Sequence, residues 1–558
     1  MSSKSRWHIL TLGAFAGAIL VPDCAWAQDA QTVQLQRQTE QLQRQIDQLQ
    51  RQLQSVQKQV SDAKRASQQT PQPAPADAVY AAEGPKLPLK AKAPPPAAVK
   101  LTWGGYLAAQ TVYRQHNTVS DVGTPYTSIP YPFSPQYSEH EFRGSARASR
   151  LSLLAEGTVD PVQKLAGFYE MDFLGVGVTS NYNQTNSWDM RLRQAYFTYD
   201  NSIWGFHLLA GQAWSMLTQN TIGITPRKEN IPLTIEGNDN VGFNYTRNWQ
   251  IRMVKDFGPT FWAGLSLENP AELVFTGSGA IGNGGTLNGL IVNWANPGTT
   301  YLGSSAFNNN FNTETAPDII GKLAFDPADW GHFETVGLVR FFTDSVFVCT
   351  VVNADGTCPT TVANVGSADS HVTTGWGVGG SVLLHVVPSY FDIQGSILYG
   401  KGVGRYAEAQ LSDVVVASDG TLSPITELSA LVGAVFHPWE GTDLYGYAGL
   451  ERADSNLFSS GAGLVGFGNP NVVNTGCLIT TAASFTSGTS NCAAVNKEVD
   501  MVSAGFWQNV YKGSYGRVAV GAQWEYIQRK SFDTIPGNGG AVSTSNNVFY
   551  TSLRYYPF

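Results

Sequence analysis

Four charged side chains in one stretch of the chain have the types and the spacing to bind ions. Glu170 and Asp172 stand two residues apart, and so do Arg191 and Arg193. Side chains two positions apart lie on the same face of a β-strand, so each pair would present its charges together. The fork of donors on a guanidinium suits a carboxylate, whether it belongs to a solute or to a neighbouring side chain. The pattern predicts a charged face that either binds small anions or braces itself with ion pairs.

The residues between these charges indicate the element that carries them. The apolar positions are Leu165, Tyr169, Met171 and Phe173 beside the acids, and Met190, Leu192 and Tyr196 beside the arginines. This alternation is typical of β-strands with one face against apolar surroundings and the other against charge. A soluble β-sandwich, which closes its apolar faces on one another, is an alternative for any single strand.

Three segments have the outline of a catalytic or cofactor motif, and each fails at a required position. Gly277–Gly282 matches the dinucleotide-binding pattern, but the Asn-Gly-Gly that follows cannot start the required helix. Gly395–Lys401 approaches a phosphate-binding loop, but Gly402 takes the place of its Ser or Thr. His140 lacks a second histidine one helical turn on, where Gly144 stands. We expect no catalytic residues, no metal site and no cofactor.

Composition narrows the class of protein. The 558 residues include 57 glycines, 23 tyrosines and 27 phenylalanines, while only 14% are charged. No run of 18 apolar residues follows the N-terminal segment, which excludes a helical membrane protein. The net charge of −8 and the lack of a basic block argue against nucleic acid as a partner.

Residues 1–27 are predicted to be a secretory signal peptide. Lys4 and Arg6 form its positive region, Ile9–Val21 its apolar core, and Ala25–Ala27 an A-x-A cleavage site. We expect the mature chain to start at Gln28.

Residues 28–65 are predicted to form an α-helical coiled coil, followed by an extended Pro/Ala-rich linker at 66–99 with eight prolines. The heptad a positions are Thr32, Thr39, Ile46, Leu53 and Val60, and the d positions are Leu35, Leu42, Leu49 and Val56. Isoleucine at a with leucine at d favours two chains, but the threonines weaken that preference, so the number of chains stays open. A lone amphipathic helix is the other interpretation.

Residues 100–558 are predicted to form an all-β, 16-stranded antiparallel transmembrane β-barrel. We place its strands at 100–114, 144–156, 164–175, 187–200, 206–216, 241–256, 259–268, 316–326, 332–345, 372–387, 389–403, 425–437, 442–452, 498–511, 516–531 and 545–558. Tight turns alternate with long loops, which is the asymmetry of an outer-membrane barrel.

The bilayer explains why such strands must close. Backbone groups in hydrocarbon need partners, so strands form a barrel without edges, and an even strand count returns both ends to the periplasm. We therefore expect the coiled coil in the periplasm. Trp103, Tyr106, Trp204, Trp262 and Trp376 stand near strand ends and are candidates for interfacial aromatic girdles. Sixteen strands leave room for an aqueous channel rather than a packed core.

Four segments carry a resemblance to a known family. Arg191–Tyr196, Leu209–Ser215, Leu267–Pro270 and Tyr399–Tyr406 resemble strand segments of the DcaP-like trimeric porins of Gram-negative bacteria. The order of signal peptide, coiled coil, linker, barrel and terminal phenylalanine is also similar. The resemblance implies a homotrimer in outer-membrane lipid that passes small hydrophilic, often anionic, solutes such as dicarboxylates.

Two questions stay open beside this resemblance, the transported solute and the phase of the last strand. The loops at 269–315 and 453–497 do not match the family, which leaves the solute open. At the C-terminus, Tyr556 and Phe558 fit the terminal pattern of barrel proteins, but Leu553 and Tyr555 form a second apolar face. The phase of this last strand is also open.

Cysteine usage fits an oxidising compartment. Cys24 precedes the cleavage site and follows a poor lipobox. The mature chain has Cys349 and Cys358 in one predicted loop and Cys477 and Cys492 in another. We expect two local disulfides, with four free thiols as the alternative.

Two sets of residues are predicted to control passage. The predicted pore-lining residues are Arg150, Glu170, Asp172, Arg191, Arg193, Arg252 and Arg340. The loop at 217–240 is predicted to narrow the pore with Arg227, Lys228, Glu229, Glu236 and Asp239. The alternatives are that the arginines neutralise wall carboxylates, and that the loop packs on a neighbouring subunit.

Three functions are compatible with these patterns. We favour a passive channel with a weak preference for anions. An adhesive or tethering protein would use the coiled coil and the external loops, with a plugged barrel. An outer-membrane enzyme would need a catalytic constellation that the sequence does not supply.

Overall fold

The computed structural model describes residues 99–175, 189–237, 239–280, 290–293, 295–296, 311–312, 314–351, 365–460, 463–480 and 491–558. The chain divides into two units, 1–93 and 94–558, and every described residue belongs to the second. The predicted signal peptide, coiled coil and almost all of the linker lie outside the described residues. Within the described ranges, no helix is long and apolar enough to cross a membrane.

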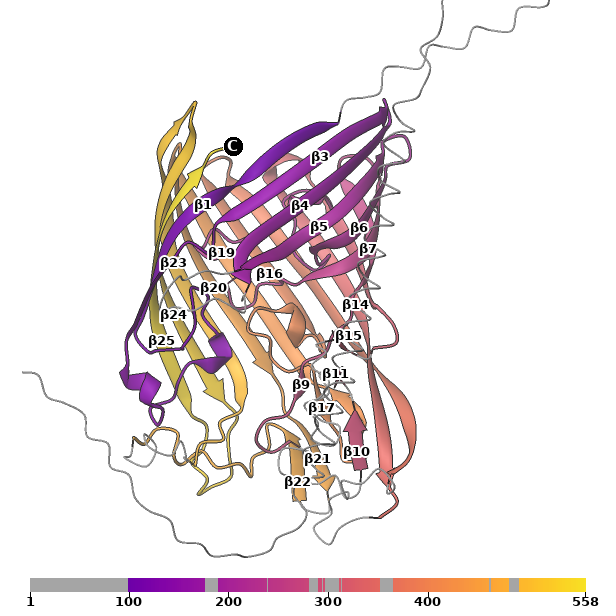
Figure 1. Cartoon of the computed structure of the whole chain (residues 1–558), viewed down its shortest axis with the longest axis vertical. Helices are drawn as coiled ribbons and strands as arrows, with labels where there is room; N and C mark the ends of the chain where they lie inside the picture. The colour runs from indigo at the N-terminus through magenta and orange to yellow at the C-terminus, as the bar shows by residue number, and fades with distance from the viewer. Residues whose placement is uncertain are drawn as a thin grey trace, which may run out of the picture. The chain divides into compact units, whose positions relative to one another are not determined.

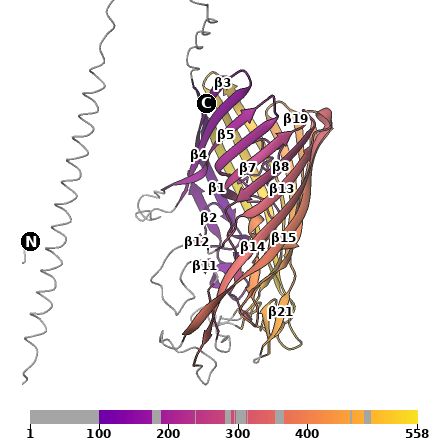
Figure 2. The ribbon, with the colours of Figure 1, turned by 90° about the vertical axis from the view of Figure 1, so that its right-hand side faces the viewer.

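Sixteen strands form a closed antiparallel wall, as the alternation predicts (Figures 1 and 2). They are β1 (Lys100–Arg114), β3 (Arg150–Asp160), β4 (Gln163–Gly175), β5 (Asp189–Asn201), β6 (Phe206–Trp214), β7 (Arg247–Asp256), β8 (Phe261–Glu268), β13 (Asp318–Phe325), β14 (Gly331–Cys349), β15 (Val365–Val387), β16 (Phe391–Lys401), β19 (Thr426–Trp439), β20 (Thr442–Ala453), β23 (Asn496–Gly513), β24 (Gly516–Ser531) and β25 (Ser543–Tyr556). β1 pairs with both β3 and β25, and this double pairing closes the barrel.

Smaller elements lie in the connections. Two short strands extend the sheet: β2 (Glu141–Ser145) pairs with β1, and β10 (Leu290–Asn293) pairs with β14. The others are β9 (Val274–Phe275), β11 (Ala295–Asn296), β12 (Phe311–Asn312), β17 (Val414–Val416), β18 (Leu422–Pro424), β21 (Asn456–Ser460), β22 (Gly463–Phe467), and the 3₁₀ turns η1 (Tyr126–Ser128), η2 (Pro135–Ser138), η3 (Ala328–Trp330) and η5 (Gly404–Tyr406).

The barrel has a short-turn end and a long-loop end. Turns of two to five residues join β3 to β4, β5 to β6, β7 to β8, β13 to β14, β15 to β16, β19 to β20 and β23 to β24. The C-terminus lies at the end with these turns, and β9, β17, β21 and β22 lie at the opposite end (Figure 1). This is the predicted asymmetry of connections.

The outer face is apolar and carries aromatic rings. Trp103, Trp204 and Trp376 are exposed, as the girdle prediction requires. The prediction is wrong for the other two girdle candidates, because Tyr106 stacks inside under Arg554 and Trp262 packs on the buried interior. An aromatic ring near a strand end also suits the lumen when it can support a guanidinium or a neighbouring apolar loop.

A bulge in β5 overturns one predicted face. The β4–β5 register shifts between Glu170 and Met171, so Leu192 and Gln194 face consecutive β4 residues. Beyond the bulge the parity reverses. Tyr196, predicted to share the outer face with Leu192, is therefore buried inside, and Phe197 is exposed instead.

The last strand has a definite phase. Leu553 and Tyr555 are exposed on the outer face, while Arg554 stacks on Trp507 in the interior. The second apolar face left open by the sequence is therefore the outer one.

Three long connections enter the barrel and pack together. The connection from β1 to β3 buries Tyr126 and Ile129, the connection from β6 to β7 buries Ile235, and the connection from β16 to β19 buries Leu411 and Val415. These side chains form one hydrophobic cluster with Phe275 of the connection from β8 to β13, with Phe467 of the connection from β20 to β23, and with wall residues of β1, β20, β23, β24 and β25. A packed core thus occupies part of the interior, which differs from the expectation of a purely aqueous lumen, because the loops bring their own apolar side chains.

Candidate functional site in the lumen

The connection from β6 to β7, residues 215–246, crosses the barrel interior and is called the inward loop below. Its backbone N–H groups donate to side chains on the far wall. Leu233 donates to the hydroxyl of Tyr447 on β20 at 3.0 Å, and Ile235 donates to Oε1 of Gln523 on β24 at 2.7 Å. Because these wall groups lie opposite β6, the loop passes through the lumen rather than over its rim.

One glycine allows the loop to approach the wall. Gly242 has φ +83°, and its N–H donates to Oε1 of Glu451 at 2.7 Å. A Cβ at this position would overlap the carbonyl oxygen of Ala430 on β19. Only glycine combines this conformation with so close a contact.

Arg227 is held in an unusual conformation within the inward loop. Its φ is +64°, a region that costs a residue with a side chain on the order of 1–2 kcal/mol. Its guanidinium donates to the hydroxyl of Tyr196 at 3.3 Å and lies 5.8 Å from the ring of Phe168. Both partners face inward, the first because of the bulge in β5. The arginine therefore projects toward the β4–β5 wall.

The other predicted residues of the loop lie at different depths. Lys228 is exposed, Glu229 is half-buried and Glu236 is buried. Burial, helped by the neighbouring Glu236, raises the pKa of Asp239 to about 7. Burial likewise raises the pKa of Glu229. Part of the predicted negative charge of this loop is therefore lost near neutral pH.

Five of the predicted pore-lining residues form one ladder of ion pairs across β3, β4 and β5. Arg191 donates two hydrogen bonds to the carboxylate of Asp172, from Nε at 3.0 Å and from Nη2 at 2.8 Å. Arg193 joins Glu170 at 2.7 Å to Asp172 at 2.8 Å. Arg150 ends the ladder, 3.9 Å from Glu170. The two carboxylates thus accept from most of the guanidinium donors that were predicted to bind a solute.

Arg252 faces inward but is engaged by the wall. Its guanidinium donates to Oε1 of Gln250 at 3.0 Å and to the carbonyl of Trp214 at 2.6 Å. It is buried, so the structure places it behind the inward loop and not on an open surface.

A cavity of about 430 Å³ separates the inward loop from the wall. Its described lining includes the arginines Arg150, Arg193, Arg227, Arg517 and Arg554 and the acids Glu170, Glu229, Glu236 and Asp443. Among the ion pairs of the described residues, none involves Arg227, Arg517 or Arg554. Arg517 lies 3.9 Å from the ring of Tyr556, and Arg554 lies 4.6 Å from the ring of Trp507.

The sequence reasoning missed Arg517 and Arg554 for different reasons. In the predicted strand at 516–531, Arg517 has the same parity as Gln523, Glu525 and Arg529, so its inward direction was available from the alternation. Arg554 depended on the phase of the last strand, which stayed open. Neither could be recognised as unpaired, because that depends on which strands close the barrel.

No family model matches the chain, and no curated protein matches it. Among solved structures, the outer membrane channel DcaP of Acinetobacter baumannii is similar over 82% of this chain and 97% of that chain, with a TM-score of 0.54 and 17% identity. The anion-selective porin from Comamonas acidovorans covers 82% of this chain and is itself covered over 100%, with a TM-score of 0.41 and 10% identity.

This chain has the fold of the DcaP channel. The resemblance drawn from the four sequence segments is confirmed at the level of the fold. At 17% identity the likeness carries no further than that, so the function has to be argued from the lumen itself.

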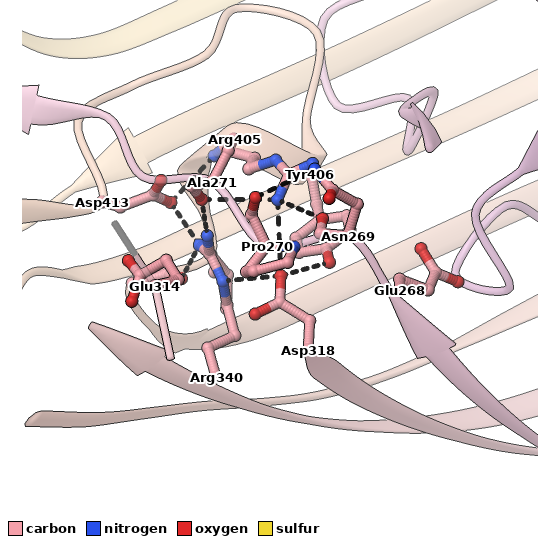
Figure 3. Close-up of polar contacts among 12 residues, drawn as sticks. Glu268, Asn269, Pro270, Ala271, Glu314, Asp318, Arg340, Arg405, Tyr406 and Asp413 are labelled. Atoms are coloured by element: carbon pink, nitrogen blue, oxygen red, sulfur yellow. Dashed lines mark hydrogen bonds and ion pairs between the residues drawn. The ribbon is translucent and has the colours of Figure 1, made fainter. Parts of the chain in front are cut away.

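Two segments of that resemblance meet in space although 136 residues separate them (Figure 3). The guanidinium of Arg405 donates to the carbonyl oxygens of Asn269 at 3.1 Å and Ala271 at 3.3 Å. The neighbouring Tyr406 donates its hydroxyl to Oδ2 of Asp318 at 2.6 Å. The hydrogen bonds of Arg405 connect the loop after β8 to the loop after β16.

Arg340 anchors the same contact from the wall (Figure 3). It pairs with Asp318 at 3.2 Å and with Asp413 at 2.8 Å, and its side chain is buried. The structure therefore places this predicted pore-lining residue beneath the loops, where it positions them. Burying so many charges is tolerable only because each finds a partner.

The described residues contain one of the two predicted disulfides. Cys477 and Cys492 form a disulfide. Cys349 is also disulfide-bonded, and its predicted partner Cys358 lies outside the described residues. In the described part of the chain, no group of three His, Cys, Asp or Glu side chains could hold a metal ion.

Proposed function

We propose that this protein is an outer-membrane porin that passes small hydrophilic solutes by passive diffusion, with a weak preference for small anions such as dicarboxylates. The observation that carries the proposal is the cavity between the inward loop and the wall, with five arginines against four carboxylates. Fixed positive charge at a constriction is how pores favour anions. The apolar outer face and the closed wall suit lipid.

The preference rests on different arginines from those first expected. The ladder of Arg150, Arg191 and Arg193 faces two carboxylates, so it braces the wall and adds little free charge. Arg517 and Arg554 instead rest on aromatic rings and keep donors for a solute. An anion passing the inward loop would meet these two guanidinium groups.

A second candidate is an adhesive or tethering protein with a plugged barrel. The hydrophobic cluster to which the three entering connections contribute favours it, because a packed core leaves less room for water. Single-channel conductance separates the two candidates. A purified protein that inserts into bilayers without conducting would support the plugged barrel.

We further propose that the barrel assembles as a homotrimer with the coiled coil of residues 28–65 in the periplasm. The heptad pattern supports self-association, because a stripe of two positions in seven is stable mainly when it pairs with copies of itself. The short-turn end, where the described barrel begins at residue 99, would then face the periplasm.

The reversal potential in a bilayer under a salt gradient tests the anion preference. The wild type should show a modest preference for chloride over potassium. Arg517→Gln with Arg554→Gln should move the reversal potential toward cations. Arg452→Gln is a matched control, because this arginine is exposed and lies 3.8 Å from Asp454. An unchanged reversal potential in the folded double variant would contradict the proposal.

A further inference from the structure

A second cavity, of about 490 Å³, lies at the long-loop end of the barrel. Its walls come from five separate parts of the chain, at 127–133, 274–278, 410–412, 467 and 492–496, together with Arg529 of β24. This volume is in the range of sites for small organic ligands. It shares no lining residue with the cavity beside the inward loop.

Aromatic rings shape one side of this cavity. Phe275 and Phe467 meet edge to face, with ring centroids 4.9 Å apart. Phe532 continues the stack beyond Phe467 at 5.1 Å. Phe275 and Phe467 belong to the buried hydrophobic cluster, so their positions are set by packing. A flat apolar body would gain contact with these fixed ring edges.

Arg529 supplies the charge of the site. Of the described residues that line the cavity, only Arg529 is charged. Its guanidinium lies 4.3 Å from the ring of Tyr131 and donates to the carbonyl of Thr127 and to Oδ1 of Asn496. Its Nε is buried without a hydrogen-bond partner.

The neighbouring carboxylates are committed elsewhere. Lys530, the next residue of β24, pairs with Glu498 at 2.6 Å and with Asp500 at 2.5 Å. Among the ion pairs of the described residues, none includes Arg529. The guanidinium is thus held in place by neutral acceptors and an aromatic face, with its charge uncompensated.

Tyr131 adds a neutral polar group. Burial raises the pKa of Tyr131, so its hydroxyl keeps its proton at neutral pH. This hydroxyl also has no hydrogen-bond partner. The wall near Arg529 therefore contains two polar groups with unused hydrogen-bonding capacity.

We propose that this cavity binds a small organic acid with one carboxylate and an apolar ring. The carboxylate would take the charge-assisted hydrogen bonds of Arg529, and the ring would lie against Phe275 and Phe467. A single cation limits the ligand to one negative charge. A second carboxylate would have to lie among apolar side chains without a partner, which is costly.

Isothermal titration of the purified full-length protein with benzoate tests the site. Titrations use the Arg517→Gln, Arg554→Gln background, so that binding in the lumen does not contribute. Benzoate should bind this background at one site per chain, and succinate and benzyl alcohol should bind much more weakly. Adding Arg529→Gln should weaken benzoate at least about tenfold, since a hydrogen bond to a charged group is lost.

A second variant separates binding from folding. Ser412→Trp adds bulk to a partly exposed lining position without changing the charge, and it should also weaken benzoate. Heat-modified gel mobility reports whether each variant is folded. Benzoate binding that survives both variants, or that is absent from the parent background, would overturn the site while leaving the porin proposal untouched.

Discussion

The role of an arginine in the barrel interior depends on which groups it contacts. Arg193 is almost fully buried and joins Glu170 to Asp172, whereas Arg554 has aromatic rings and a backbone carbonyl around it. The first holds strands together, and the second keeps charge for a solute. Residue type and face alone do not distinguish these roles.

The ladder leads to a prediction about stability. Arg193→Gln leaves Glu170 and Asp172 short of a partner, and removing one member of a buried ion pair costs about 3–5 kcal/mol. We expect a lower unfolding temperature on gels and a small change in reversal potential. Arg191→Gln should cost less, because Arg191 is more exposed. A large shift in selectivity with unchanged stability would contradict this role.

Asp239 predicts a pH dependence of selectivity. Its pKa is raised to about 7, so the carboxyl is neutral below pH 7 and charged above it. Raising the pH from 6 to 8 therefore adds negative charge to the inward loop, and the anion preference should fall. Asp239→Asn should reduce that change in the reversal potential.

Asp419 offers a matched control for this measurement. Its hydrogen bond from Thr421 lowers its pKa, so it stays charged across the same range. Asp419→Asn should leave the pH dependence as in the wild type. A pH dependence as large in Asp239→Asn as in the wild type would assign the titration to another group.

At the scale of elements, the inward loop is the part that divides the lumen. Within it, residues 219–230 fold back on themselves. The N–H of Thr221 donates to the carbonyl oxygen of Lys228, and the N–H of Asn230 donates to the carbonyl oxygen of Gln219, both at 2.7 Å. This small hairpin carries Arg227 and Lys228. Its anchors lie further along the loop, at Leu233 and Ile235.

Deleting Pro226–Asn230 should widen the passage. The anchors at Leu233 and Ile235 remain, so we expect a folded barrel with higher single-channel conductance. Arg227→Gln with Lys228→Gln removes the charge at constant length and should alter selectivity more than conductance. If the deletion left conductance unchanged, the hairpin would not narrow the pore.

The contact around Arg405 should control how the loops are held. Arg405→Ala removes hydrogen bonds to Asn269, Ala271 and Asn248 and leaves Asp318 with less positive charge. We expect a loss of about 3 kcal/mol, the scale for a broken buried ion pair. Faster proteolysis of the loops at 269–280 and 402–425 would show it. Equal cleavage rates in the variant and the wild type would be evidence against the contact as an anchor.

At the scale of the whole molecule, the coiled coil is proposed to support assembly. Leu42→Asp with Leu49→Asp places charge at two d positions and should weaken the oligomer in mild detergent. Gln43→Asp with Gln50→Asp, at two neighbouring e positions, makes the same charge change outside the apolar stripe. An oligomer equally stable in both variants would reduce the helix to a spacer.

The sequence by itself determined the class of fold, because strand alternation is local. The sixteen strands, their order and the two kinds of connection all follow from a period of two interrupted by turns. The inward direction of Glu170, Asp172 and Arg193 followed from the same rule. It failed for Tyr196, where one extra residue in a bulge reverses the face and is visible only in the pairing with β4.

The tertiary structure decided which side chains and loops contact one another. Arg405 meets Asn269 across 136 residues, and the inward loop finds Tyr447 and Gln523 on strands far along the chain. Such contacts depend on closure of the barrel and on how deep each loop enters it, which no local pattern encodes. Whether an arginine is braced by a carboxylate or left open to a solute is therefore a property of the closed barrel.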